Sequence, residues 1–358
     1  MGGRTPTRLI GPPPFSRVWP ALLIAALVFA LTACAGEPED EAHGGACTDG
    51  ERALRVGFYA HFAPVSSSAG AEPGDADFDT HLGYEADLLS ALEAMEGAGL
   101  SFERRAIGAW TDIWLLAASP EYDLVGGGIT MLESRRYDGS GAEAIVFTSG
   151  HIAFRQSLLV RAEDRDRFPD HDALTSGDRV GALRNTTGEA RLLRLTGLTD
   201  AEGVLAAGVQ VETPRGEIVA DGTDAYVITA AGASPALEGR QRLQPPSGDM
   251  PQAIYLGDLS GEAELLDALA EGTVDAVARG EIGNREAAHA SGAAFVVTAL
   301  DPAVEWGGFS LALSDAELAR CIDAKIDYLT DERRIGYAQW QGNPDVFMRR
   351  AERWNQGR

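Results

Sequence analysis

Strand-like and helix-like segments alternate along most of this chain, and this alternation is the feature that most constrains its fold. Residues 54–58 alternate apolar and polar side chains as a strand does, and residues 84–95 repeat apolar side chains at helical spacing. A strand over 102–107, a helix over 110–118 and a short buried strand over 123–125 follow. Alternation at this spacing predicts an α/β fold with a parallel sheet.

A second unit of the same kind follows, with one interruption. Residues 179–183 are predicted as a strand, residues 187–194 as a helix and residues 293–298 as a closing strand. The stretch 208–252 breaks the alternation because it is rich in Gly, Pro, Ala and Asp, with one strand-like run at 225–228. We interpret this stretch as an insertion in the second unit. The 358 residues suit two domains, at roughly 150 residues for each.

The C-terminal part is expected to be helical. Ser314 with Glu317 three residues later forms a capping-box pattern, which predicts a helix that begins there and runs to about Thr330. Residues 335–341 predict another short helix.

The N-terminus carries a targeting segment. Residues 1–33 hold three arginines and no acidic residue, and the apolar run 21–30 is too short to span a membrane. The run leads into Leu-Thr-Ala-Cys at 31–34, which resembles a bacterial lipobox whose cysteine, Cys34, is lipidated. An ordinary secretory signal with a chance cysteine is the alternative. Residues 34–52 are predicted to form a flexible tether, so we expect an exported protein that is lipid-anchored to the bacterial cell envelope.

The remaining cysteines, the histidines and the net charge limit which covalent links, cofactors and partners this protein can have. Cys47 and Cys321 form an even pair in an oxidising compartment, which predicts one disulfide, with a buried free thiol as the alternative. The sequence has no Cys-x-x-Cys, and its six histidines lack metal-ligand spacing, so we expect neither a metal nor a cofactor. With 54 acidic residues against 30 basic ones, the net charge of −24 argues against nucleic acid as a partner.

Four groups of segments, in order along the chain, resemble the extracellular solute-binding proteins of the polar amino-acid class. The first group resembles the opening of that family, the second its first-lobe ligand loop, the third its second-lobe loop, and the fourth the segment before its last ligand residue. The resemblance covers roughly 54–354, apart from the insertion. The groups are 54–57 with 62–64 and 83–88; 122–130 with Arg135 and 147–148; 179–189; and 272–277.

The resemblance implies a two-lobe periplasmic-binding-protein fold of type II, in which two crossing strands join two α/β lobes around the ligand. Lobe one would comprise residues 53–153 plus 306–358, and lobe two residues 154–305. The crossing strands would lie near 151–155 and 301–307. Such a protein is not an enzyme but captures a small carboxylate-bearing solute, here expected to be an amino acid, and delivers it to the permease of an ABC importer.

The resemblance also assigns a subsite for the ligand carboxylate. Arg135 occupies the family's carboxylate-binding position, where the planar guanidinium binds a carboxylate through two hydrogen bonds. Gly128 would offer a backbone N–H, and Thr130 a hydroxyl, to the same carboxylate. The family often has serine where Gly127 and Gly128 stand, so this chain keeps only backbone donors there. A solvated arginine at a helix start is the alternative for Arg135.

Further expected ligand contacts come from both lobes. Thr186 and Thr187 lie at a strand-to-helix turn, where backbone N–H groups favour an anion, although simple helix capping is the alternative. Phe62 and Trp110 match the family's aromatic walls, with core packing as the alternative. Tyr59 stands where many relatives carry an acid that contacts a basic side chain, which argues against lysine or arginine as the ligand.

The main departure from the family lies at the partner of the ligand's ammonium group. The family places an aspartate where this chain has Gly280, and the next residue, Glu281, could take the role through its longer side chain. Alternatively, the ligand has no α-amino group. Two other classes remain open: an enzyme that resembles cyclohexadienyl dehydratases, with Glu281 as the sole candidate general acid, and a receptor module that presents its ligand state to a partner.

Overall fold

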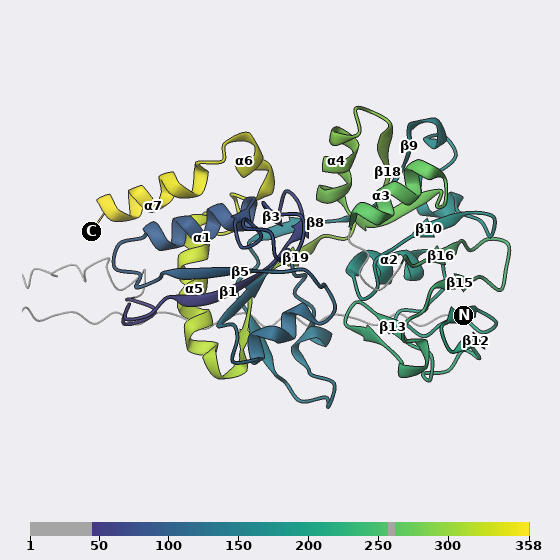
Figure 1. Cartoon of the computed structure of the whole chain (residues 1–358), viewed down its shortest axis with the longest axis horizontal. Coiled ribbons are helices and arrows are strands. Elements are labelled where there is room, and N and C mark those ends of the chain that lie inside the picture. Colours follow the sequence, from purple (N-terminus) through teal and green to yellow (C-terminus); the bar gives the residue numbers. More distant parts are fainter. Residues whose placement is uncertain (1–44, 257–261, 358) are drawn as a thin grey trace, which may run out of the picture. The chain divides into compact units, whose positions relative to one another are not determined.

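The structure is a computed structural model that describes residues 45–256 and 262–357, all within one compact unit, Glu39–Arg358 (Figure 1). The predicted signal peptide, the lipobox Cys34 and most of the predicted tether lie outside the described residues. In the part of the chain that the structure describes, no helix has the length and apolar character needed to cross a bilayer.

The first sheet has five strands and forms the centre of lobe one. β1 pairs in parallel with β5 on one side and β6 on the other, while β20 runs antiparallel to both β6 and β7. Because β20 comes from the C-terminal part, this lobe is discontinuous in sequence. In spatial order the strands are β5 (Phe102–Ile107), β1 (Leu54–Tyr59), β6 (Leu124–Gly126), β20 (Ser310–Ala312) and β7 (Ile145–Phe147).

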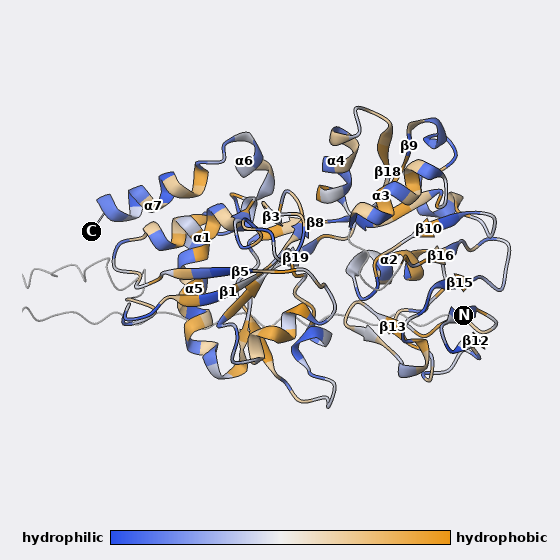
Figure 2. Ribbon diagram, viewed as in Figure 1, coloured by the Kyte–Doolittle hydropathy of each residue, from blue (hydrophilic) through white to orange (hydrophobic). Residues whose placement is uncertain are grey.

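Helices cover this sheet and bury its apolar side chains. Helix α1 buries Leu88, Leu89 and Leu92, which share one face because they lie three and four residues apart. Helix α7 lies alongside α1 (Figure 1), and both α1 and α5 alternate hydrophobic and hydrophilic residues along their lengths (Figure 2). The helices are α1 (Tyr84–Ala94), α5 (Ala316–Leu329), α6 (Tyr337–Gly342) and α7 (Val346–Gln356).

The second sheet has eight strands and forms the centre of lobe two. β10 pairs in parallel with β16 and β17, and antiparallel pairs extend the sheet on both sides. Helices α2 (Thr187–Leu195), α3 (Glu262–Glu271) and α4 (Glu281–Ala290) belong to this lobe. The strand order is β12 (Gly216–Val219), β11 (Gln210–Thr213), β15 (Arg242–Gln244), β16 (Gln252–Ile254), β10 (Arg179–Gly181), β17 (Ala276–Gly280), β9 (Gln156–Arg161) and β18 (Phe295–Leu300).

The stretch 208–252 is more ordered than its composition predicts. It supplies β12, β11 and β15, which continue the sheet of lobe two beyond β16, and a separate hairpin of β13 (Ile228–Thr229) and β14 (Gly232–Ala233). The single strand predicted at 225–228 is therefore wrong in extent and number. These strands have only two to four residues each, too short to show a clear alternation.

Two short strands connect the lobes. β8 (Ile152–Phe154) and β19 (Glu305–Gly307) pair antiparallel, and each lies within the segment where a crossing strand was expected. A small three-stranded sheet follows β1 and carries Phe62; its strands are β2 (His61–Phe62), β3 (Ser66–Ser68) and β4 (His81–Leu82). Short 3₁₀ helices complete the described chain at Ile113–Ala118, Glu133–Arg136, Ala162–Asp164, His171–Ala173, Pro235–Leu237 and Leu313–Asp315.

Several helix predictions need correction. The capping box at Ser314 and Glu317 is wrong, because α5 begins at Ala316 with Asp315 at its N-cap and no side-chain capping bond. The helix predicted over 110–118 is a 3₁₀ helix that begins at Ile113. Helices α3, α4 and α7 were not predicted.

A disulfide ties the start of the described chain to α5. Cys47 and Cys321 are bonded, with their Cα atoms 5.4 Å apart. The Cys47 N–H also donates to the Ala98 carbonyl, so the part of the predicted tether 34–52 around Cys47 is fixed to lobe one.

Candidate functional site

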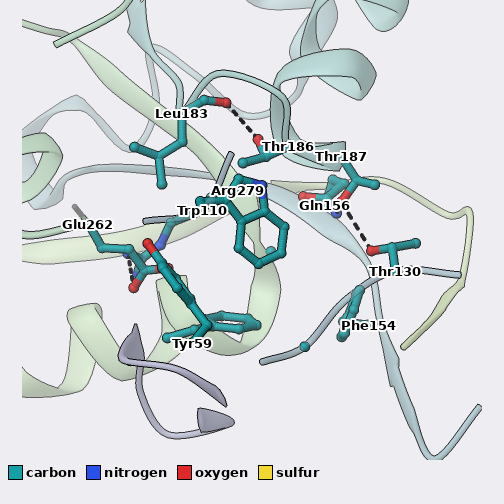
Figure 3. A pocket seen from close by; sticks show the side chains of 14 residues that line it. Tyr59, Trp110, Thr130, Phe154, Gln156, Leu183, Thr186, Thr187, Glu262 and Arg279 are labelled. Atoms are coloured by element: carbon teal, nitrogen blue, oxygen red, sulfur yellow. Dashed lines mark hydrogen bonds and ion pairs between the residues drawn. The ribbon is translucent and has the colours of Figure 1, made fainter. Parts of the chain in front are cut away.

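A pocket opens where residues of the two lobes face each other (Figure 3). About 540 Å³ of space within it is free of protein atoms, part of which is open to solvent. Of the nine predicted ligand contacts the structure brings seven to this pocket, and it leaves out Arg135 and Glu281. The lining residues are Tyr59, Phe62, Trp110, Gly128, Thr130, Phe154, Gln156, Leu183, Thr186, Thr187, Gly188, Glu262, Arg279 and Gly280.

Aromatic rings from lobe one and from the crossing strand β8 form one wall of the pocket. Tyr59 ends β1 and is almost fully buried, and its ring meets the Trp110 indole edge-on, with centroids 5.1 Å apart. Phe62 comes from the small sheet that follows β1, and Phe154 from the crossing strand β8. Such a wall excludes water and suits an apolar or planar ligand group.

Close packing against this wall explains the glycines at 127 and 128. A Cβ on Gly127 would lie 2.3 Å from the Tyr59 Cβ, and one on Gly128 would lie 2.5 Å from the Phe62 ring. Both residues also have positive φ, 129° and 69°, which disfavours any side chain. The serine that relatives often carry at these positions therefore does not fit beside Tyr59 and Phe62.

The backbone N–H groups of this turn already have a carboxylate partner. Gly127 N and Gly128 N donate to the two oxygens of Glu85, at 2.6 and 2.9 Å. Glu85 is completely buried at the start of α1, and the His151 Nε2 beside β8 lies 3.2 Å from its Oε1. The Gly128 N–H that was expected to contact a ligand therefore donates to an internal carboxylate in this structure.

Arg135, which was expected to bind the ligand carboxylate, does not line the pocket. Its side chain is fully buried, and its guanidinium donates to the carbonyls of Thr130 (3.1 Å), Ala230 (3.0 and 3.2 Å) and Asn185 (3.3 Å). The guanidinium also stacks 4.2 Å from the centre of the Trp114 ring. Burial lowers the pKa of Arg135 to about 9, so the side chain stays protonated at neutral pH.

Arg135 instead holds the two lobes together. Ala230 lies at the tip of the β13–β14 hairpin and Asn185 in the loop before α2, so both carbonyls belong to lobe two. The Trp110 Nε1 donates to the same Asn185 carbonyl at 3.0 Å. We refer to these bonds from Arg135 and Trp110 to Ala230 and Asn185 as the interlobe latch.

Thr186 and Thr187 line the pocket and also serve the protein's own structure. The Thr186 hydroxyl caps α2 by accepting the Glu189 N–H at 3.1 Å, as the capping alternative expected. The Thr187 hydroxyl accepts from the Gln156 amide at 2.9 Å and lies 3.4 Å from the Thr130 hydroxyl of the other lobe.

Glu281 is the second predicted contact that lies outside the pocket lining. As the first residue of α4, it forms ion pairs with Arg155 at 3.3 Å and Arg285 at 2.6 Å. The carboxylate that was expected to be the partner of the ligand's ammonium group therefore neutralises arginines outside the pocket.

Sequence reasoning missed the ion pair that does line the pocket. Arg279 NH1 and Glu262 Oε2 lie 2.7 Å apart, and both side chains are largely buried. Burial raises the pKa of the Glu262 carboxyl, while the adjacent Arg279 acts to lower it. The signal for Arg279 was present in the sequence, since a single arginine follows the apolar residues of a buried strand. The apolar spacing of helix α3, which begins at Glu262, was also present but was not recognised.

Gln156 is a second missed residue. It begins β9, is 4% exposed, and its Nε2 donates to Thr187 Oγ1 and to Glu305 Oε2 at 2.6 Å. The acceptor carboxylate of Glu305 fixes which amide atom is nitrogen. The Gln156 Oε1 is buried and accepts no hydrogen bond within the described part of the chain. A buried acceptor that lines a pocket is suited to a ligand that donates.

The Gly128→Ala variant tests the packing of the aromatic wall. The added methyl must displace the Phe62 ring, so we expect a lower melting temperature. The matched control is Gly141→Ala, because Gly141 also has a positive φ of 82° but has no heavy atom within 4 Å of an added Cβ. Equal effects of the two substitutions would contradict the role of packing against Phe62.

The structure offers no candidate metal centre in residues 45–256 and 262–357, where no three His, Cys, Asp or Glu side chains cluster in a way that could hold an ion. The chemical groups that line the pocket are those of its aromatic wall, its ion pair and its hydroxyl and amide groups.

Comparisons with known proteins identify the fold. No protein-family model and no curated protein matches the sequence. Among solved structures, an amino-acid ABC transporter substrate-binding protein from Streptococcus pneumoniae bound to L-arginine has a TM-score of 0.53, at 16% identity over 84% of this chain and 93% of that one. The ancestral amino acid-binding protein AncCDT-1, a precursor of cyclohexadienyl dehydratase, has a TM-score of 0.52, at 17% identity over 84% of this chain and 95% of that one.

A third structure gives the same result. ArtJ from Geobacillus stearothermophilus, an arginine-, lysine-, histidine-binding protein, has a TM-score of 0.50, at 18% identity over 83% of this chain and 99% of that one. Matches at this identity show the fold alone. The predicted α/β, two-lobe periplasmic-binding-protein fold of type II is confirmed.

Proposed function

We propose that this protein is a solute-binding protein that encloses a small solute, an amino acid or a related small carboxylate, between its two lobes. The observation that carries the proposal is the pocket itself, which both lobes line and which the interlobe latch closes. Residues of lobe one supply most of the aromatic wall, and residues of lobe two supply the ion pair and the start of α2. A ligand that contacts both lobes shifts an open–closed equilibrium toward the closed state.

The cellular role follows from the N-terminal sequence. A lipobox at Cys34 and a tether that ends before Cys47 would hold the binding unit at the bacterial cell envelope, outside the cytoplasm. Delivery of the solute to an ABC importer permease is the role that agrees with such an anchor, with the resemblance of the sequence and with the amino-acid-binding proteins that share the fold.

Thermal melting of the purified protein against a panel of solutes tests the proposal. The panel holds the twenty common amino acids, simple carboxylates and prephenate. A solute at one hundred times its Kd adds about 2.7 kcal/mol to the stability, which raises the melting temperature by several degrees. We expect such a shift with one group of amino acids or carboxylates, and no shift with any of them would contradict the proposal.

Two variants place the binding at this pocket. Trp110→Ala removes part of the aromatic wall and one latch bond, so we expect it to abolish the shift. The control is Tyr137→Ala, which truncates an exposed aromatic side chain of the same lobe and should leave the shift intact. Loss of the shift in both variants would argue against this site.

A second function, an enzyme on the same scaffold, has one observation in its favour. Glu262 is a pocket carboxyl whose pKa burial raises, as a general acid requires. Consumption of prephenate by the wild-type protein, and loss of that activity in Glu262→Gln, would establish the enzyme in place of the receptor.

A further inference from the structure

The protein itself uses the groups that sequence reasoning assigned to a ligand carboxylate. Arg135 donates to three backbone carbonyls, and the Gly128 N–H donates to Glu85. Among the residues that line the pocket in the described part of the chain, Arg279 is the one arginine or lysine, and Glu262 is the one carboxylate. A charged ligand group in this pocket therefore meets this pair.

We propose that Arg279 and Glu262 together recognise the α-carboxylate and α-ammonium groups of a net-neutral amino acid, an inference that rests on the proposed function. In the structure the two side chains neutralise each other across 2.7 Å. A zwitterion entering the pocket inserts between them: its carboxylate accepts from Arg279 and its ammonium donates to Glu262. No charge is left uncompensated by this exchange, which matters in a largely apolar site.

The Arg279 guanidinium is held in position for this role. Its Nε donates to Asn284 Oδ1 at 2.9 Å, and the fully buried Asn284 in turn donates to Ser157 Oγ at 2.9 Å. Glycine at 283 leaves room for the guanidinium, since a Cβ there would lie 3.0 Å from Arg279 NH2. A planar donor group fixed at one nitrogen presents its other nitrogens in a defined direction, which favours binding of a carboxylate.

The charge balance of the pair determines the ligand class. A basic amino acid would bring a second cation to a pocket whose described lining offers only Glu262, and an acidic one would bring a second anion to Arg279. Tyr59, beside the pair, adds no charge at neutral pH, and burial raises its pKa further above neutral. The site therefore favours amino acids with uncharged side chains over arginine, lysine, glutamate and aspartate.

The side of the pocket that lies away from Glu262 is placed to contact the side chain of the ligand. Figure 3 shows Glu262 and Tyr59 to one side of the Trp110 indole and Gln156 with Thr187 to the other. The buried Gln156 Oε1, which no described group donates to, can accept from an N–H or O–H of the ligand. A side chain that carries such a donor satisfies this acceptor, so uncharged polar amino acids should bind most tightly.

The experiment compares three versions of one solute by titration calorimetry. The solutes are the uncharged amino acid that gives the largest melting shift in the panel, its α-carboxamide, which lacks the carboxylate, and its des-amino acid, which lacks the ammonium. For Arg279→Gln we expect at least tenfold weaker binding of the amino acid, but less than threefold weaker binding of the carboxamide. For Glu262→Gln we expect the same contrast between the amino acid and the des-amino acid.

Matched control variants separate a loss of ligand recognition from a general loss of structure. Glu212→Gln and Arg242→Gln change a half-exposed ion pair of the same lobe and should leave all three affinities unchanged. Arg279→Lys keeps the positive charge and should restore part of the preference for the carboxylate.

The outcomes distinguish this inference from the proposed function. If the wild type binds only basic or acidic amino acids, or if each pocket variant weakens all three solutes equally, the inference is overturned while the receptor function stands. If the wild type binds no amino acid or carboxylate at all, the proposed function fails first.

Discussion

Replacing Arg135 with alanine is expected to weaken solute binding by two orders of magnitude and to lower the melting temperature by several degrees. The variant removes hydrogen bonds from a buried cation to the Ala230 and Asn185 carbonyls of the other lobe. Hydrogen bonds to charged groups contribute about 1.5–3 kcal/mol each, and hydration of the open state offsets part of the loss. A net loss of about 2–4 kcal/mol from the closed state corresponds to roughly 30- to 1000-fold in affinity.

The losses of affinity for different solutes show whether Arg135 acts on lobe closure or on the solute itself. Because Arg135 acts on closure and not on the solute, Arg135→Ala should weaken binding of an amino acid and of its α-carboxamide by the same factor. Arg136→Ala is the matched control, since this neighbouring arginine is partly exposed and pairs with Glu133 and Glu143 of its own lobe. Calorimetric affinities within a few-fold of the wild type, or a loss confined to the amino acid, would contradict the latch.

Replacing Arg240 with methionine is expected to destabilise the protein by about 3–5 kcal/mol. Arg240 and Glu189 are both buried, and Arg240 donates two bonds to one Glu189 oxygen, at 2.6 and 2.9 Å. The variant leaves the Glu189 carboxylate buried without its cation. At roughly 2 °C for each kcal/mol in a chain of this size, the melting temperature should fall by about 6–10 °C.

A double variant provides the control for Arg240. Because Glu189→Gln removes the stranded charge, Arg240→Met combined with Glu189→Gln should recover a large part of the lost stability. Scanning calorimetry of the two variants measures both effects. A fall of less than about 2 °C for Arg240→Met would show that the pair contributes little.

The stretch 208–252 has a structural role that its composition did not reveal, because it carries residues that both variants affect. The stretch carries Ala230, which accepts from Arg135, and Arg240, which holds Glu189. The Glu189 carboxylate in turn accepts the Asn185 N–H at 2.7 Å, and Asn185 is the second latch residue of lobe two. The insertion therefore supports closure of the pocket.

The sequence predicts the first sheet well because its signals are local. Strands β1 and β5 and helix α1 follow the expected segments to within a residue, since each has a clear apolar period. Helices α3 and α4 carry usable patterns too, and they were missed beside the more evident strands around them. Leu265, Ala268 and Leu269 of α3, for example, are buried at helical spacing.

The candidate site was predictable only in part, because its chemistry depends on contacts between distant segments. The aromatic residues and the threonines lie beside recognisable strand ends, so their place at the pocket could be inferred. The partners of Arg135 in lobe two could not be inferred, since the Asn185 and Ala230 carbonyls lie 50 and 95 positions away along the chain. The same holds for Glu85, whose contact with Gly128 spans 43 positions.

The most direct test of closure around a solute is small-angle X-ray scattering of the protein, stripped of any bound solute by unfolding and refolding. Scattering is measured with and without a saturating amount of the amino acid that gives the largest melting shift. If solute binds between the lobes and favours the latched state, the radius of gyration falls on saturation, and it stays larger for Arg135→Ala than for the wild type. A saturated wild-type protein whose scattering curve is unchanged would contradict closure of the two lobes around the solute.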